Sequence, residues 1–384
     1  MHSRENNFDA LRFWAALVVL WSHAFPVAHG SEHMEPLYAL SGGQSTFGAV
    51  AVSLFFVISG YLITRSFERS PSAWDFVRAR LLRIMPALLI VLLLTAFVLG
   101  PALSGWSLSD YLRSSVVYKY FLGQATFTRQ IDELPGVFRD NPSPWVNASL
   151  WTLRYEVACY VLVFALGVTR CLTRPVTLLL YLGAIAYLGV VEHLPLPPGA
   201  ELPGPDRAAD LGAKFLAGAL IYQWRVPLRG RWAAACLALL VASVAFGEFR
   251  SAERTLFPYL VLYLAIGMSK RVPAPTRLGD LSYGTYIYAW PVSQCVTLAS
   301  PEPFWVASIG TPVVLGLAFL SWHTVEKRAL ARKRAPSPYR SLMLPPRSAS
   351  DQRLGGAAAA AGLKSPLTSA VVGRSLSPRS RATS

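Results

Sequence analysis

The stretch LRFWAALVVLWSH, Leu11 to His23, is apolar enough to cross a bilayer, yet it carries Arg12 near its start and His23 eleven residues later. At about 100° per residue, eleven steps return to nearly the same face of an α-helix, so these two side chains share a face. A rise of 1.5 Å per residue separates them by roughly 16 Å, about half the thickness of the hydrocarbon core. The stretch therefore predicts a membrane helix with ionisable groups at two depths.

The composition supports this interpretation. Of 384 residues, 53% are hydrophobic and only 15% are charged, and the mean hydropathy is +0.39. Such a chain is too apolar for an ordinary soluble enzyme and is typical of a polytopic membrane protein. The four cysteines lack the spacing of a zinc site or a disulfide framework, and no signal-peptide cleavage pattern follows the first apolar run.

The net charge of +15 is concentrated at the C-terminus, since residues 327–384 hold 12 Lys and Arg against one Asp. This distribution indicates a basic cytoplasmic tail and not a nucleic-acid-binding groove, because no basic face with interleaved aromatic residues occurs elsewhere. The tail is rich in Arg, Ser, Pro and Ala and has little to bury, so we expect it to be disordered. We therefore divide the chain into a membrane domain, residues 1–326, and a tail, residues 327–384.

The membrane domain is expected to be all-α, with about ten transmembrane helices. Apolar segments of spanning length lie at about residues 10–28, 47–65, 81–103, 149–169, 176–192, 208–225, 231–247, 255–269, 280–300 and 303–325. Alternate loops between them are rich in arginine, which is typical of cytoplasmic loops. Both termini are therefore expected in the cytoplasm, and the 104–148 segment is expected to form a structured external loop.

A few ionisable residues fall within or next to these spans, where they are costly unless they serve a site or a pathway. In the predicted topology Arg12, Arg80 and Arg83 form a cluster near the cytoplasmic side, while His23 and Glu156 lie in the outer half of the membrane. This arrangement suggests an anionic ligand that enters from the cytoplasm and a proton-transfer centre deeper in the membrane.

Each of these residues also has a purely structural interpretation. Arg80 and Arg83 could mark only the cytoplasmic side, and His23 could be a core histidine satisfied by one neighbour. Arg12 could form a local ion pair with Asp9, and Glu156 could pair with the neighbouring Arg154.

Six separated motifs bear on this choice: NNFDALRFWAALVVLWSH, SLFFVISGYLITRSF, FVRARLLRIMP, LPGVF, NASLWTLRYEVACY and LSYGTYIYAWPV. Together they resemble, in order, blocks of the acyltransferase-3 family of integral-membrane O-acyltransferases, which includes O-antigen and exopolysaccharide acetyltransferases. The resemblance covers about residues 6–326. Two departures are Arg154, where many members have proline, and Ala289, where many have histidine.

The resemblance implies transfer of an acyl group, usually acetyl from acetyl-CoA, to a carbohydrate hydroxyl, and it marks the same five ionisable residues as functional. We expect His23 to be the general base, with Glu156 orienting it or contacting the sugar, because the imidazole pKa lies near neutrality. Arg12, Arg80 and Arg83 are expected to hold the phosphates of acyl-CoA while its pantetheine arm reaches toward His23.

The expected partners are therefore acyl-CoA, a carbohydrate acceptor and the lipid bilayer of the cell membrane, with no metal and no nucleic acid. A transporter of a small anionic or sugar-linked substrate is the competing interpretation, because charges facing inward could line a permeation path without chemistry.

Overall fold

All regular elements of the described chain are helical. The computed structural model describes residues 6–192, 204–268 and 272–332, and no strand occurs within them. Six helical segments in these ranges are long and apolar enough to cross a membrane, namely Phe8–His29, Phe47–Arg69, Ala73–Leu103, Ala148–Val168, Arg174–Glu192 and Pro303–Ala331. The all-α membrane fold predicted from the sequence is confirmed.

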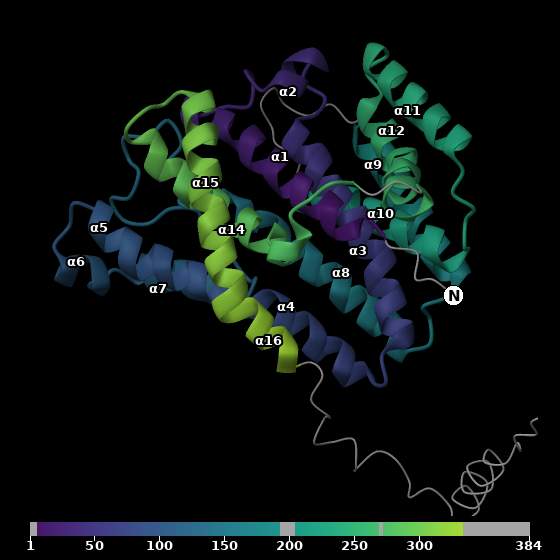
Figure 1. The fold of residues 1–384 in the computed structure, drawn as a ribbon, viewed down its shortest axis with the longest axis horizontal. Coiled ribbons are helices and arrows are strands. Elements are labelled where there is room, and N and C mark those ends of the chain that lie inside the picture. Colours follow the sequence, from purple (N-terminus) through teal and green to yellow (C-terminus); the bar gives the residue numbers. More distant parts are fainter. Residues whose placement is uncertain (1–5, 193–203, 269–271, 333–384) are drawn as a thin grey trace, which may run out of the picture. The chain divides into compact units, whose positions relative to one another are not determined.

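Most α-helices are joined by short connections, with a longer irregular one at residues 126–147 (Figure 1). In chain order they are α1 (Phe8–His29), α2 (Pro36–Leu40), α3 (Phe47–Arg69), α4 (Ala73–Leu94), α5 (Gly100–Leu103), α6 (Leu108–Arg113), α7 (Ser115–Ala125), α8 (Trp151–Val168), α9 (Arg174–Glu192), α10 (Gly204–Gln223), α11 (Gly230–Ala245), α12 (Phe249–Thr255), α13 (Phe257–Leu262), α14 (Ser282–Thr297), α15 (Pro303–Ser321) and α16 (Lys327–Ala331).

Three π-helical turns and a 3₁₀ turn extend these helices. Thr95–Leu99 joins α4 to α5, Tyr263–Gly267 continues α13, and Trp322–Glu326 joins α15 to α16. A 3₁₀ turn at Ala148–Leu150 leads directly into α8. The irregular turn before α16 places Glu326 inside the protein, where it takes part in the site described below.

Each of the ten predicted spans coincides with a helical segment, but four of these segments fall short of a typical membrane span. Helices α11 and α14 have 16 residues each, and the α13 segment is shorter still. Helix α10 carries several charged residues, among them Asp210 and Lys214, which bind each other at 2.9 Å. The number of helices that cross the membrane therefore remains a prediction.

Polar residues at the helix ends fix where α3 and α4 begin. Thr46 accepts a hydrogen bond from the backbone N–H of Ala49 at 3.0 Å, and Ser72 accepts one from that of Asp75 at 3.1 Å. Such caps satisfy N–H groups that have no partner within the helix. Helix α1 ends at Gly30, whose φ of 72° lies in the left-handed region that favours glycine.

Helices α3 and α10 pack closely at two glycines. A Cβ atom added at Gly60 would lie 1.8 Å from the carbonyl oxygen of Phe215, and one added at Gly218 would lie 2.2 Å from that of Val57. Small residues at such a crossing allow two backbones to approach, which is a common way of packing membrane helices. This contact fixes α3, which forms one wall of the candidate site.

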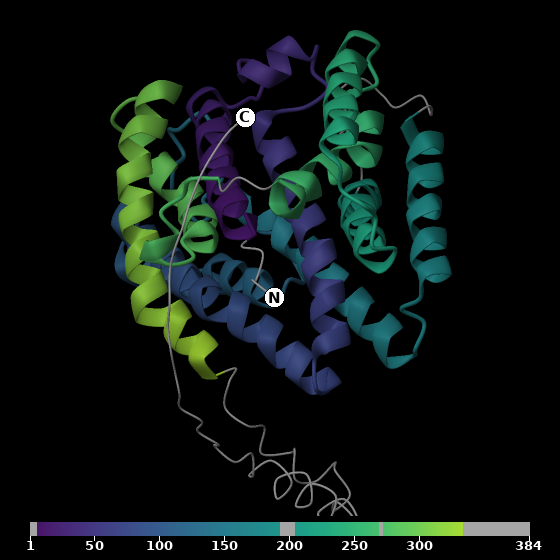
Figure 2. The ribbon, with the colours of Figure 1, turned by 45° about the vertical axis from the view of Figure 1, so that its right-hand side comes forward.

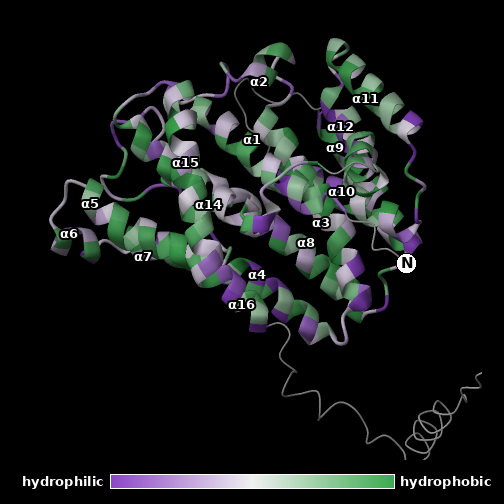
Figure 3. Cartoon of the chain, in the orientation of Figure 1, coloured by the Kyte–Doolittle hydropathy of each residue, from purple (hydrophilic) through white to green (hydrophobic). Residues whose placement is uncertain are grey.

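Helix α1 packs between α3 and α14, and α8 packs against α3 and α4 (Figures 1 and 2). Apolar residues dominate the visible surfaces of α7 and α15, whereas hydrophilic residues gather at α16 and the adjoining end of α4 (Figure 3). The five helices α1, α3, α4, α8 and α14 surround the cavity of the candidate site.

The helical segment that begins with α15 runs to Ala331, beyond residue 326, the predicted end of the membrane domain. Helix α16 packs on α4, and Arg78 Nη2 donates a hydrogen bond to the carbonyl oxygen of Arg332 at 2.8 Å. The first residues of the expected tail are thus helical. Residues 333–384, which make up the rest of it, lie outside the described residues.

Candidate active site

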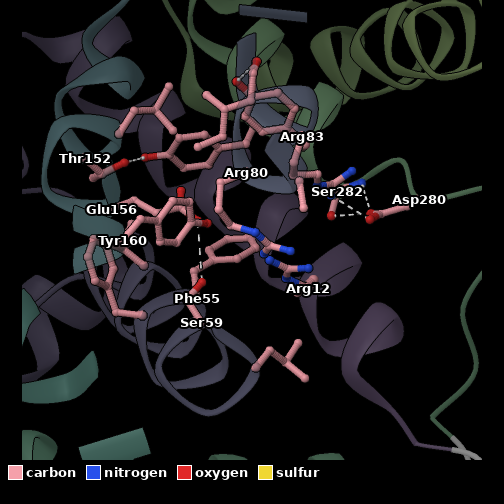
Figure 4. Close-up of a pocket in the computed structure, with 18 of the residues that line it drawn as sticks. Arg12, Phe55, Ser59, Arg80, Arg83, Thr152, Glu156, Tyr160, Asp280 and Ser282 are labelled. Atoms are coloured by element: carbon pink, nitrogen blue, oxygen red, sulfur yellow. Dashed lines mark hydrogen bonds and ion pairs between the residues drawn. The ribbon is translucent and has the colours of Figure 1, made fainter. Parts of the chain in front are cut away.

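A cavity of about 330 Å³ lies between α1, α3, α4, α8 and the beginning of α14. Four of the five residues singled out in the sequence line it, namely Arg12, Arg80, Arg83 and Glu156 (Figure 4). The remaining wall is largely apolar or aromatic and includes Leu330 of α16. The cavity therefore combines a cationic cluster with a carboxylate in a setting that is shielded from water on several sides.

Arg83 is already paired with acidic side chains of the protein. Its Nη2 atom lies 2.6 Å from Oδ2 of Asp280, and its Nη1 atom lies 3.6 Å from Oε2 of Glu326. Ser321 Oγ donates a hydrogen bond to Glu326 at 3.0 Å, which holds the second carboxylate in place. Arg83 thus ties α4 to the loop before α14 and to the turn after α15.

Asp280 is held in this cluster by Arg83 and by the backbone N–H and hydroxyl of Ser282. Ser282 donates from its hydroxyl to Oδ1 at 2.5 Å. Since Asp280 is charged and adjacent to Arg83, it compensates one of the three cationic side chains.

Arg12 and Arg80 differ from Arg83, because neither forms an ion pair within the described ranges. The Nε atom of each is buried and has no hydrogen-bond partner. Arg80 lies against the aromatic rings of Phe76 and Tyr160, with its guanidinium carbon 5.9 Å from each ring centroid. Figure 4 shows both guanidinium groups directed into the same part of the cavity. The local Asp9–Arg12 ion pair, considered as an alternative, is not formed.

Glu156 belongs to a polar stripe along one face of α8. Tyr160 Oη donates a short hydrogen bond to Glu156 Oε1, and Ser59 Oγ of α3 lies 3.5 Å from the same oxygen. One turn earlier, Thr152 Oγ1 lies 2.6 Å from the hydroxyl of Tyr286 on α14. The neighbouring Arg154 does not pair with Glu156, since its Nη2 atom donates to the hydroxyl of Tyr155 at 2.7 Å.

His23 lies apart from the residues that line this cavity. Its ring contacts Trp290 of α14 edge to face, with centroids 5.0 Å apart, and its Nδ1 atom lies 3.4 Å from the hydroxyl of Ser149. Ser149 is fully buried in the 3₁₀ turn that leads into α8. The structure therefore groups Glu156 with the arginines, and the expected outer pair of His23 and Glu156 is not a direct contact.

Several residues of the site could not be singled out from the sequence. Asp280 is the first residue of one predicted span and Glu326 directly follows another, and their pairing with Arg83 joins segments that are 197 and 243 residues apart in the sequence. The stripe on α8 did leave a signal, because Ser149, Thr152, Glu156 and Tyr160 follow helical spacing. No group of three or more His, Cys, Asp or Glu that could hold a metal ion occurs in the described part of the chain.

Comparisons with known proteins agree with the resemblance noted in the sequence. Residues 5–323 match the family described as "Acyltransferase domain", of the acyltransferase-3 type. The chain is 33% identical over 347 residues to a protein named O-acetyl transferase from Shigella phage Sf6, which covers 86% of this chain and 98% of the relative.

It is also 30% identical over 351 residues to Nodulation protein 10 of Rhizobium leguminosarum bv. viciae, covering 85% and 93% of the two chains. A third relative, the putative membrane-bound transacylase BcsY of Komagataeibacter xylinus, is 24% identical over 359 residues. The match covers 87% of this chain and 85% of the relative. No solved structure matches the chain. On these grounds the protein is an acyltransferase and belongs to the acyltransferase-3 family.

Proposed function

We propose that this protein is a membrane O-acyltransferase that moves an acyl group, acetyl in the simplest case, from acyl-CoA to a hydroxyl of a cell-surface or exported carbohydrate. The observation that carries the proposal is the pair of unpaired guanidinium groups, Arg12 and Arg80, in a cavity about three turns along α1 from His23. Buried cations without a partner are costly, so a buried ligand of opposite charge would compensate them.

The shape of coenzyme A suits this arrangement. Its phosphates lie at one end and its thioester at the other, joined by the long pantetheine arm. Arg12 and Arg80 would bind phosphate oxygens, for which the planar guanidinium group is well suited. Arg12 and His23 are roughly 16 Å apart along one face of α1, so an extended arm can reach from one to the other. Arg83, held by two carboxylates, would support the phosphate site indirectly.

His23 would act on the acceptor. In this mechanism its Nε2 atom takes the proton of the sugar hydroxyl as the hydroxyl oxygen attacks the thioester carbonyl carbon. The tetrahedral oxyanion then collapses, the carbon–sulfur bond breaks, and the imidazolium returns the proton to the departing thiolate. The Ser149 hydroxyl would accept a hydrogen bond from Nδ1–H, which keeps the lone pair of Nε2 free for the substrate.

Glu156 would bind donor groups of either substrate. It is already an acceptor for Tyr160 and Ser59, and its position among the arginines favours a role in the cavity over a role as partner of His23. A carboxylate near Arg80 also limits the net positive charge that the cavity presents before the donor enters.

The proposed location is the cell membrane, with ten spans and both termini in the cytoplasm. The arginine-rich loops support this topology, which would open the arginine cavity to cytoplasmic acyl-CoA and bring His23 toward the external side. Reporter fusions at Pro336 and within residues 110–140 should give cytoplasmic and external signals respectively. An external signal at Pro336 would contradict the topology.

The direct test of function uses purified protein in lipid nanodiscs with acetyl-CoA and candidate glycans. We expect release of free CoA that depends on the glycan, together with acetylated product of matching amount. A transporter would instead move substrate between compartments of a proteoliposome without releasing CoA. Glycan-dependent transport with no acyl transfer under any donor would contradict the proposal.

A further inference from the structure

A second cavity, of about 640 Å³, lies at the end of the helix bundle where arginine-rich loops gather. It is formed by the end of α3, the connection between α8 and α9, the end of α10 and the end of the α13 segment. Three arginines line it, namely Arg69, Arg174 and Arg225, together with one carboxylate, Glu68. None of these residues belongs to the site described above.

The amide of Gln223 is the clearest sign that this cavity takes a ligand. Gln223 lines the cavity and is only 8% exposed, yet neither its Nε2 nor its Oε1 atom has a hydrogen-bond partner. A buried amide that is unpaired at both atoms is unusual, because each unmade hydrogen bond costs free energy. A ligand with both an acceptor and a donor would satisfy it.

The charges around Gln223 favour an anion. Glu68 is engaged by the hydroxyl of Tyr222 at 2.6 Å, and Arg174 donates through Nε to the backbone carbonyl of Gln223 at 3.1 Å. Arg69 and Arg225 have no ion-pair partner among the residues that the structure describes. Three arginines against one glutamate leave this cavity with an excess of two positive charges.

The backbone conformation at Arg225 suits a test of its side chain. Its φ is 52°, in the left-handed region that favours glycine, and it ends α10 with a hydrogen bond from the N–H of Val226 to the carbonyl of Ile221. A glycine would fit this helix end without strain, so replacing Arg225 by glycine removes the charge without opposing the backbone conformation.

We propose that this second cavity binds a phosphate ester at the cytoplasmic face, with Arg69, Arg174 and Arg225 contacting the phosphate and Gln223 contacting the group that carries it. Guanidinium groups form paired hydrogen bonds with phosphate oxygens, and an amide discriminates among the groups attached to them. The phosphate ester can come from a soluble nucleotide or from the headgroup of an anionic phospholipid, which share this chemistry.

The test measures hydrogen exchange of the full-length protein in nanodiscs, followed in the peptide that covers residues 221–228. One arm adds adenosine 3′,5′-bisphosphate to phosphatidylcholine nanodiscs, and the other replaces phosphatidylcholine stepwise by phosphatidylglycerol. We expect one of these probes to slow exchange in this peptide, and the arm in which protection occurs identifies the source. Because the readout is local, a nucleotide bound in the cavity lined by Arg12 and Arg80 would not produce it.

Arg225→Gly provides a sharp variant, because it removes the charge while placing glycine in the backbone conformation that glycine prefers. We expect thermal stability to be kept or raised, and the amount of probe needed for half-protection to rise about tenfold, as for a lost charged hydrogen bond. Gln223→Leu, which keeps the volume and removes both polar atoms, should weaken protection as well.

Arg170→Gly is the matched control. Arg170 ends α8 with a φ of 60° and the same pattern of backbone hydrogen bonds, and it carries the same charge, but it does not line the cavity. Its replacement should leave protection unchanged. The proposal is overturned if neither probe protects residues 221–228 in the parental protein, or if Arg225→Gly and Arg170→Gly have equal effects.

Discussion

Ser149 Oγ lies 3.4 Å from Nδ1 of His23, and this contact aligns two helices of the site. Eleven residues after Ser149, Tyr160 lines the same cavity as Arg12, which stands eleven residues before His23. Helices α1 and α8 therefore run in opposite directions, and each carries polar groups at both ends of an interval of roughly 16 Å. The stripe on α8 through Thr152 and Glu156 connects the arginine cavity with the surroundings of His23.

Replacement of His23 by glutamine should remove most turnover. A positioned general base contributes about 10²- to 10⁴-fold, and glutamine keeps much of the side-chain volume without a basic nitrogen. The measurement is CoA release at equal protein abundance, with acyl-CoA binding determined separately and expected to survive. His29→Gln is the control, since His29 is exposed at the end of the same helix. Near-parental turnover of His23→Gln would contradict the assignment of the base.

Ser149→Ala should lower kcat about fivefold and leave KM for acyl-CoA unchanged, because one hydrogen bond of about 1 kcal/mol that orients the imidazole is lost. Steady-state kinetics measure both constants. In the background of His23→Gln, the same serine replacement should have no further effect on residual turnover, since the two residues act together. An additional loss in the double variant would show that Ser149 acts independently of His23.

The sequence predicted the helical fold and singled out four ionisable residues that line the cavity, because both features depend on local sequence pattern. Apolar runs mark helices, and charged residues within them stand out. It could not separate Arg83 from Arg80, because that distinction depends on Asp280 and Glu326, which reach Arg83 only in the folded chain. Nor could it show that His23 and Glu156 have different neighbours, since both were placed only by depth in the membrane.

The pairing of Arg83 leads to different expectations for two nearby arginines. Arg80→Gln removes an unpaired cation, so thermal stability should be kept while KM for acyl-CoA rises about tenfold through lost phosphate contacts. Arg83→Gln leaves Asp280 and Glu326 without their cation, which should cost about 3 kcal/mol of stability. Kinetics and thermal unfolding of both variants check this distinction.

The combination of Arg83→Gln with Asp280→Asn serves as the control for that cost. Removing both charges of the closest pair should recover part of the stability lost in the single variant. Equal stability of the parental protein and Arg83→Gln would mean that the arginine is not held by its carboxylates. In that case Arg83 would contact the donor as Arg80 does.

A separate buried ion-pair network should contribute to stability and not to catalysis. Lys214 lies 2.9 Å from Asp210 and 3.2 Å from Glu253, while Arg254 binds Asp210 at 2.7 Å and also contacts Glu192. Lys214→Met leaves Glu253 buried without a cation, so we expect a loss of about 3 kcal/mol. Adding Glu253→Gln should restore much of the thermal stability. An unchanged KM for acyl-CoA in the folded fraction of either variant would confirm that the network lies outside the site.

The C-terminal segment should divide into a part that the enzyme needs and a part that it does not. Leu330 of α16 lines the arginine cavity, and the helix is fastened to α4 by the hydrogen bond from Arg78 to Arg332. Truncation after Glu326 removes this wall, so KM for acyl-CoA should rise and thermal stability should fall. Truncation after Arg340 keeps α16 and removes only residues whose composition offers little to bury, so activity in membranes should stay near the parental value.

Both truncated proteins are compared at equal abundance. Complete loss of activity in the longer protein would show that residues beyond 340 take part in the reaction or in assembly, whereas full activity in the shorter one would mean that α16 does not shape the donor site.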